Sequence, residues 1–166
     1  DLVRSRGLGD VYKRQVNEVT PAILQKAEEF DLHYIQLHGT ETSEQCLNLK
    51  RAGLGVIKVF PIASMSDLKS TVCYENVCDY FLFDTACTGY GGSGKTFDWQ
   101  VLTAYHGSTP FLLSGGLKPD SLHSLKEFRH PAWAGIDLNS GFEISPGKKD
   151  TTLLNTFIKQ IKSNIE

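Results

Sequence analysis

The sequence predicts an α/β fold built on a parallel sheet, and three observations support this. Short apolar runs, the expected strands, recur at intervals of 22 to 30 residues and centre near Ile35, Ile57, Leu82, Leu112 and Ile136. Amphipathic stretches separate these runs, as expected when strands and helices alternate along the chain. Polar or glycine-rich segments follow most of the expected strands at their carboxyl ends, which is the face where α/β folds bind ligands.

The composition limits the class of protein. The 166 residues suit one domain with a buried core. With 40% apolar residues, a net charge of -2 and a pI of about 6.2, the chain offers no electrostatic case for binding nucleic acid or an anionic membrane. No apolar run approaches the roughly 20 residues of a membrane span, and no secretory signal is visible. We therefore expect a cytoplasmic protein whose partner is a small molecule.

The four cysteines do not suggest a metal site. Cys46, Cys73, Cys78 and Cys87 lack the paired spacing of zinc ligands, and no histidine pair accompanies them. Reduced thiols are the expected state in the cytosol. We expect neither a metal nor a cofactor.

The first fifteen residues differ from the rest. Residues 1–15 hold four basic residues, have no clear period and resemble translated adapter sequence. We predict that residues 1–15 are a non-native polar tail and that residues 16–166 form one domain.

The expected helices follow in order between the strands. Their predicted starts are Thr20-Pro21, Ser43, Ser66, Asp98, Lys118-Pro119 and about Asp150. The first helix should bury an apolar stripe of Ile23, Leu24, Ala27 and Phe30. The last should turn inward Leu153, Leu154, Phe157, Ile158 and Ile161.

Asp84 ends the buried run Tyr80–Phe83, and a glycine-rich segment follows it. This places an acid at the carboxyl end of a strand, where it could act as a general acid. Gly89 to Thr96 also satisfies the P-loop pattern, in which a strand turns directly into a helix around a phosphate. Here Gly89 comes five residues after Asp84 and the next helix start is only at Asp98, so the context argues against a nucleotide triphosphatase. The segment is then expected to belong to a barrel enzyme with its acid at the end of a strand, and a mobile surface loop is the other alternative.

Two consecutive strands end in small residues, first Ser114-Gly115-Gly116 and then Asn139-Ser140-Gly141. Glycine lets the backbone approach an anion closely, and its N–H groups supply donors. Phosphate sites after the last two strands are characteristic of (β/α)8 barrels. We predict that both turns bind one phosphate, although ordinary tight turns would have the same composition.

Other polar residues near strand ends have weaker signals. His38 precedes Gly39 at a strand end; it could contact a ligand, although a lone histidine there is more often a structural hydrogen-bonder. Asp137 could hold a ligand hydroxyl. Cys87 could be reactive and Lys95 could neutralise a substrate charge, yet a free structural thiol and a solvated loop lysine are the commoner cases.

Four blocks of the sequence, in matching order and spacing, carry a resemblance to a known family. They are Ile35–Gly39; Leu82–Asp84 with Tyr90–Trp99; Leu113–Leu117; and Gly135–Glu143 with Pro146–Asp150. Together they resemble phosphoribosylanthranilate isomerase, a (β/α)8-barrel enzyme of tryptophan biosynthesis, from about Val16 to the C-terminus. The block Gly91-Gly92-Ser93-Gly94-Lys95-Thr96-Phe97-Asp98-Trp99 is the most specific of them.

The resemblance implies a reaction and roles for several residues. The family catalyses an Amadori rearrangement of N-(5'-phosphoribosyl)anthranilate to 1-(2-carboxyphenylamino)-1-deoxyribulose 5-phosphate. Its general acid matches Asp84, and its strand-eight aspartate matches Asp137. Its phosphate turns match Gly115-Gly116 and Ser140-Gly141. The implied partner is a phosphosugar substrate.

The chain also departs from the family pattern. The family's first strand carries Lys-Ile-Cys-Gly, whose cysteine is the general base, and a later arginine holds the anthranilate carboxylate. Neither has a match, so we expect a partial barrel lacking about the first two and a half βα units and inactive as written. The fold alternative is a doubly wound open sheet. The functional alternatives are another phosphosugar barrel enzyme and a non-catalytic phosphosugar-binding fragment.

Overall fold

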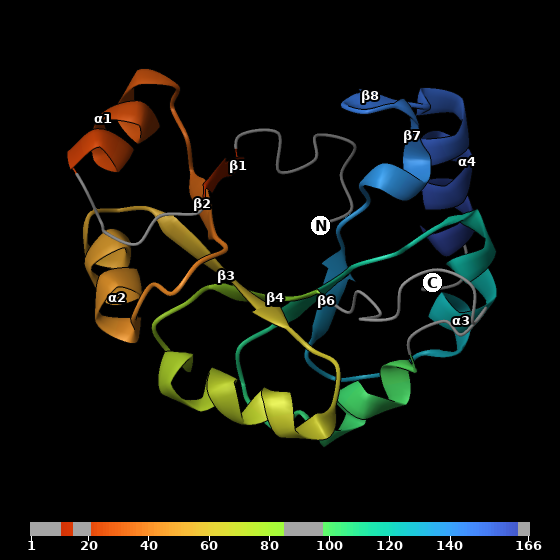
Figure 1. Cartoon of the computed structure of the whole chain (residues 1–166), viewed down its shortest axis with the longest axis horizontal. Coiled ribbons are helices and arrows are strands. Elements are labelled where there is room, and N and C mark those ends of the chain that lie inside the picture. Colours follow the sequence, from red (N-terminus) through yellow and green to blue (C-terminus); the bar gives the residue numbers. More distant parts are fainter. Residues whose placement is uncertain (1–10, 15–20, 85–97, 163–166) are drawn as a thin grey trace.

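The computed structural model describes residues 11–14, 21–84 and 98–162 of the chain. Its main sheet has six parallel strands, and each strand neighbours the next one in sequence. The strands are β1 (Val11–Arg14), β2 (Tyr34–Leu37), β3 (Gly55–Pro61), β4 (Tyr80–Asp84), β5 (Phe111–Ser114) and β6 (Trp133–Ile136). A doubly wound sheet needs a reversal of strand order, so that alternative is wrong. The strands form an open arc with the helices outside it (Figure 1).

Part of the predicted tail lies in this sheet. Residues 11–14 form β1, which pairs with β2 from Val11 opposite Tyr34 to Arg14 opposite Leu37. Residues 1–10 and 15–20 lie outside the described residues. That residues 1–15 are foreign to the protein stays a prediction.

The helices alternate with the strands as the sequence predicts. They are α1 (Pro21–Glu29), α2 (Ser43–Arg51), η1 (Met65–Tyr74), η2 (Trp99–Ala104), η3 (Pro119–Ser121), α3 (Leu122–Glu127), η4 (Ser140–Phe142) and α4 (Thr151–Lys162). A small hairpin of β7 (Glu143–Ser145) and β8 (Lys148–Lys149) precedes α4. Thr42 and Gln45 form a capping box at the start of α2. Asp98 caps η2 by accepting a hydrogen bond from the backbone N–H of Gln100, as predicted.

Two connections, η1 and η2, are 3-10 helices rather than α-helices. In η1 the hydroxyls of Ser70 and Thr71 donate to the carbonyl oxygens of Asp67 and Leu68, three residues earlier. The hydroxyl of Thr103 makes the same kind of bond in η2. Such side-chain bonds compete with the α-helical ladder and favour the tighter turn.

The apolar stripe of α1 is narrower than the sequence predicted. Ile23 and Ala27 are buried, whereas Leu24 is 37% exposed and Phe30 is 57% exposed. Phe30 follows the last residue of the helix, so it leaves the helical face. Its ring instead lies beneath the ammonium group of Lys26, 5.2 Å from the ring centroid. Of the α4 residues predicted to face inward, Phe157 and Ile161 are buried.

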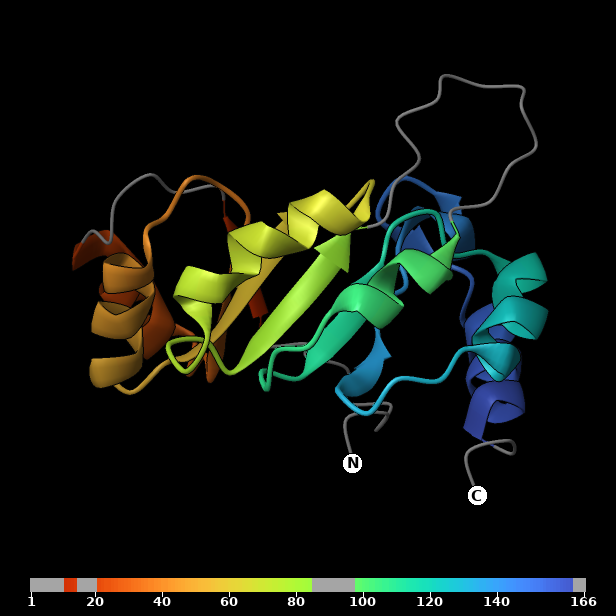
Figure 2. The same ribbon diagram turned by 90° about the horizontal axis from the view of Figure 1, so that it is seen from below.

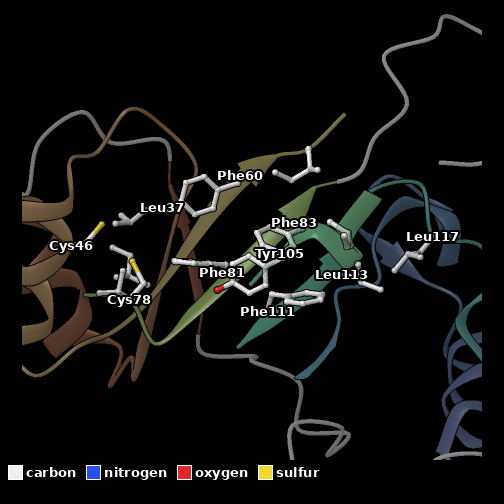
Figure 3. Packing of buried hydrophobic residues seen from close by; sticks show 14 of the residues in the cluster. Leu37, Cys46, Phe60, Cys78, Phe81, Phe83, Tyr105, Phe111, Leu113 and Leu117 are labelled. Carbon is white, nitrogen blue, oxygen red and sulfur yellow. The ribbon is translucent and has the colours of Figure 1, made fainter. Parts of the chain in front are cut away.

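The main hydrophobic core lies between the outer face of the sheet and the helices. Phe81, Phe83 and Phe111 point outward from β4 and β5 and meet Tyr105 (Figure 3). Their ring centroids lie 4.8 to 6.2 Å apart in tilted or edge-on contacts. Such ring pairs contribute about 0.5–1.5 kcal/mol each beyond the burial of their area. The aromatic layer therefore fixes the two central strands from outside.

A smaller cluster covers the inner face of the arc. Its buried members, drawn from β3, β4 and β5, are Ile57, Val59, Leu82 and Leu112. They alternate along each strand with the outward-facing residues, as a pleated strand requires. Side chains at inner positions near the carboxyl ends of the strands therefore face the same side as this cluster.

Glu75 joins the amino ends of β4 and β5. One carboxylate oxygen, Oε2, accepts hydrogen bonds from the backbone N–H groups of Ser108 and Thr109 at 3.1 and 3.0 Å, and from both hydroxyls at 3.2 and 2.8 Å. The other, Oε1, lies 2.7 Å from the hydroxyl of Tyr105. Burial alone would raise the pKa of Glu75, but these hydrogen bonds outweigh it and hold the pKa below its usual value.

We expect Glu75→Gln to lower the free energy of unfolding by about 1.5–3 kcal/mol, the range for hydrogen bonds to charged groups. A carboxyl whose pKa is lower in the folded state stabilises the fold above the unfolded pKa, about 4.3 for Glu, and loses this effect as pH falls through the folded pKa. The difference between wild type and variant should therefore be full at pH 7 and shrink below about pH 4.3.

Urea unfolding at a series of pH values measures this difference. The exposed Glu127, which pairs only at the surface with His123, supplies the control variant Glu127→Gln, expected to change stability by less than about 0.5 kcal/mol. A difference for Glu75→Gln that grows on acidification would contradict the assignment.

Candidate active site at the carboxyl ends of the strands

Asp84, the predicted acid, is the last residue of β4 and is half-buried. Phe81 and Phe83 belong to the outer core and Leu82 to the inner cluster. By strand alternation Asp84 shares the inner face with Leu82. Its backbone is fixed on both sides, since its carbonyl accepts a hydrogen bond from the N–H of Ile62 at 3.0 Å and it pairs in register with Ser114.

Ser114 and Asp137 continue the same row on the next two strands. Ser114 ends β5 and is 7% exposed. Its hydroxyl donates to Asp137 Oδ2 at 3.1 Å, and the amide of Asn139 donates to the same oxygen at 2.7 Å. Asp137 therefore ties together the ends of β5 and β6 and the start of the turn after β6. Asp84 and Ser114 are the last residues of β4 and β5, and Asp137 directly follows the neighbouring strand β6.

An irregularity in β6 aims Asp137 at this row. The register shifts between Phe111 and Leu112, so that Ala134 is an extra residue opposite β5. Ala134 packs on the inner cluster and Ile136 on the outer core. A bulge of this kind re-aims the side chains that follow it. Asp137 is thereby placed on the inner face, within reach of Ser114.

The two predicted phosphate turns lie against each other. Gly115 and Gly116 have φ angles of +88° and +62°, a backbone conformation that favours glycine. A Cβ atom on Gly141 would overlap the carbonyl oxygen of Leu117. The turn after β6 therefore packs directly on the turn after β5. Ser140, the middle residue of the turn Asn139-Ser140-Gly141, is exposed at the start of η4.

The segment after β6 is held by a lysine that sequence reasoning did not assign to the site. Lys149 Nζ donates to the carbonyl oxygen of Leu138 at 3.1 Å and to Glu143 Oε1 at 2.8 Å. The hydrogen bond from Lys149, together with one from the N–H of Gly147, lowers the pKa of Glu143. The sequence does contain a signal for this contact. Glu143 and Lys149 have opposite charges and flank Pro146-Gly147, turn residues of the kind that join two short strands.

His38 lies one residue beyond the end of β2 and is exposed. It is at the same end of the sheet as Asp84, with β3 between their strands. Gln36, the inner residue of β2, is 6% exposed. His38 therefore lies along the same rim as the acid, but two strands away from it.

Several predicted residues lie outside the described part of the chain. These are Cys87, Lys95 and Gly89–Thr96, including most of the Gly91–Trp99 block. Within residues 11–14, 21–84 and 98–162 no group of three or more acidic, histidine or cysteine side chains could hold a metal ion. Among the same residues no helix is long and apolar enough to cross a membrane.

The sequence matches known proteins over most of its length. The model of a family described as N-(5'phosphoribosyl)anthranilate (PRA) isomerase matches residues 13–160. An N-(5'-phosphoribosyl)anthranilate isomerase of Phocaeicola vulgatus is 67% identical over 151 residues, covering 91% of this chain and 74% of the relative. One from Parabacteroides distasonis is 55% identical over 146 residues, covering 88% of this chain and 66% of the relative. The chain thus spans about two thirds to three quarters of these relatives.

Solved structures agree with the sequence match. The crystal structure of phosphoribosyl anthranilate isomerase from Thermotoga maritima has a TM-score of 0.75 and 34% identity, covering 92% of this chain and 72% of that one. Another isomerase, in complex with reduced 1-(o-carboxyphenylamino)-1-deoxyribulose 5-phosphate, has a TM-score of 0.70 and 29% identity, covering 92% and 70%. These likenesses confirm that the six-stranded arc is part of a (β/α)8 barrel.

The close packing of the two turns can be tested through Gly141. Adding a methyl group in Gly141→Ala would force Gly141 and the carbonyl of Leu117 apart, and overpacking of this kind costs about 1–3 kcal/mol. Thermal or urea unfolding measures this loss. The neighbouring exposed change Ser140→Ala should alter stability by less than about 0.5 kcal/mol. Equal stability of the two variants would show that the turns do not touch as described.

Proposed function

Because the chain belongs to the N-(5'-phosphoribosyl)anthranilate isomerase family, we propose that its inner rim forms the proton-donating and phosphate-binding part of that isomerase's site. The observation that carries the proposal is the row of Asp84, Ser114 and Asp137 at the carboxyl ends of three adjacent strands. The carboxyl-terminal face is where barrel enzymes place their catalytic groups. The substrate is then N-(5'-phosphoribosyl)anthranilate.

Asp84 is the general acid in this proposal. Its carboxyl group gives a proton to the ribose ring oxygen while the bond from that oxygen to C1 breaks. A base removes the proton from C2, and the resulting enolamine rearranges to the ketone. The acid gives one proton and the base removes one, so substrate and product have the same composition, as an isomerisation requires. A positioned acid contributes about 10²–10⁴-fold to the rate of such a step.

The phosphate is held by the two turns that pack on each other. Gly115 and Gly116 present their backbone in the left-handed conformation that forms anion-binding nests. Asn139, Ser140 and Gly141 supply the facing turn. Asp137 braces this pair through Ser114 and Asn139, and in the proposal it also orients the sugar.

The general base of the family has no counterpart among the 166 residues. The family's base is the cysteine of Lys-Ile-Cys-Gly, and none of the four cysteines of the 166 residues stands in that sequence. We therefore expect the 166-residue chain by itself to bind the phosphosugar but not to turn it over. A non-catalytic phosphosugar-binding module would share the turns, yet it would not depend on Asp84.

A charge placed in the phosphate turn tests binding. We expect Gly116→Asp to weaken binding of reduced 1-(o-carboxyphenylamino)-1-deoxyribulose 5-phosphate to the 166-residue chain by about 10–100-fold. This corresponds to losing one charge-assisted hydrogen bond of about 1.5–3 kcal/mol. Titration calorimetry measures the affinity. A Cβ at Gly116 meets nothing within 4 Å, so a local clash would not explain a loss of binding.

Gly53→Asp is the matched control. Gly53 also has a positive φ, +93°, and open space around its Cβ position, but it lies between α2 and β3 at the amino ends of the strands. The same charge there, again at a positive φ, should leave the affinity within twofold. Equal losses in both variants, or no binding by the wild-type chain, would refute the phosphate site.

The role of Asp84 is tested in an active form of the protein. The chain can be joined to the part of the Phocaeicola vulgatus relative outside the match, which the family resemblance predicts to carry Lys-Ile-Cys-Gly. We expect Asp84→Asn to lower kcat of this chimera by about 10²–10⁴-fold with ligand affinity retained. Asp31→Asn, at an exposed residue with a φ of +50°, should not change kcat. An Asp84→Asn chimera with unchanged kcat would exclude Asp84 as the acid.

A further inference from the structure

A buried ion pair lies directly behind the rim residue His38. Lys58, in the middle of β3, is 3% exposed, and Glu41, between β2 and α2, is 1% exposed; Nζ and Oε2 lie 3.1 Å apart. Lys58 faces the outer core between Val56 and Phe60, a position where apolar side chains are expected. Removing two charges from water costs several kcal/mol per ion, so a buried pair is a poor source of stability in itself. This suggests a role beyond stability.

Both charges act on the residue that follows His38. The N–H of Gly39 donates to Glu41 Oε2 at 3.0 Å, and the carbonyl oxygen of Gly39 accepts from Lys58 Nζ at 2.8 Å. The pair thus occupies both backbone polar groups of Gly39 with charge-assisted hydrogen bonds, which are the strong ones. Lys58 pairs in register with Leu37, the last residue of β2, so it lies immediately beneath this turn.

The turn is anchored at a further point. The carbonyl oxygen of Glu41 accepts a hydrogen bond from the hydroxyl of Tyr74 at 2.8 Å, which joins the turn to η1. Lys58 Nζ also lies 5.6 and 5.9 Å from the ring centroids of Phe60 and Tyr74, where aromatic faces favour a cation. The turn cannot move without breaking these buried interactions. The turn after His38 is therefore fixed by side-chain contacts as well as by strand pairing.

We propose that Glu41 and Lys58 are positioning residues, which hold His38 at the rim so that its imidazole contacts the ligand. This inference rests on the proposed function, because it assigns His38 to the same ligand site as Asp84. Neither Glu41 nor Lys58 touches the ligand itself. Their effect on binding passes through the backbone of Gly39.

The test measures affinity and the His38 turn separately in the 166-residue chain. The variants are Lys58→Met, and the double variant Glu41→Gln with Lys58→Met, which leaves no unpaired buried charge and so remains foldable. His38→Ala is made in each background. The readouts are calorimetric affinity for reduced 1-(o-carboxyphenylamino)-1-deoxyribulose 5-phosphate, hydrogen exchange of the Gly39 amide, and NMR relaxation of the His38 ring.

Positioning predicts three results. Affinity falls about tenfold or more in Lys58→Met and in the double variant, the Gly39 amide exchanges faster, and the His38 ring becomes more mobile. His38→Ala then costs little further affinity, because the contact is already lost and the two changes are not additive. Glu75→Gln is the control for lost stability, since it loosens the opposite end of the sheet and should leave affinity within twofold.

A merely structural role predicts something else. The variants would lose stability as Glu75→Gln does, keep their affinity within twofold, and show the same cost of His38→Ala in every background; that result overturns the proposal. Failure of the wild-type chain to bind the ligand would instead refute the proposed function. In that case an unchanged His38 ring and Gly39 exchange in the double variant would still overturn the positioning role.

Discussion

Each functional group on the rim owes its place to the two-residue pleat of parallel strands paired in sequence order. The pleat sends Phe81 and Phe83 to the helices and leaves Leu82 and Asp84 on the inner face. Parallel pairing brings all carboxyl ends to one edge, and the pairing of β4 with β5 makes Asp84 and Ser114 neighbours. The aromatic layer outside holds this pairing. The chemistry of the rim is therefore a consequence of the packing on the opposite face.

This dependence makes the register of β6 decisive. Shifting a strand by one residue exchanges its two faces. The extra residue Ala134 performs such a shift within β6, and Asp137 rather than Ile136 then faces Ser114. Without it, the carboxylate that braces both turns would point into the outer core, where a charge is costly. The bulge at Ala134 thus turns Asp137 toward the site, which a regular strand would not do.

The sequence predicts much of this arrangement, and the failures have physical causes. Strands β2 to β6 and the position of Asp84 can be predicted from the sequence, because short apolar runs and the polar or glycine residues that end them are local signals. The prediction that Leu24 is buried was wrong. Helical periodicity shows which side of α1 is apolar, but not how much of that side the rest of the fold covers. The inward aim of Asp137 depends on a bulge that no local signal marks. Lys58 stands in an apolar strand, and its partner Glu41 is 17 residues away, so only the tertiary structure joins them.

A carboxylate holds a turn at each end of the sheet, Glu75 at the amino ends of the strands and Glu41 at the carboxyl ends. Glu75 and Glu41 both accept backbone N–H groups from a nearby turn. Glu75 does so at the amino ends, among hydroxyl groups, where barrel residues serve stability. Glu41 does so at the carboxyl ends, beside a buried cation that the fold must desolvate. At Glu75 the carboxylate closes the turn with neutral hydroxyl donors. The Glu41–Lys58 pair costs more desolvation than neutral donors would. It holds its turn in one conformation, which a ligand-binding rim requires.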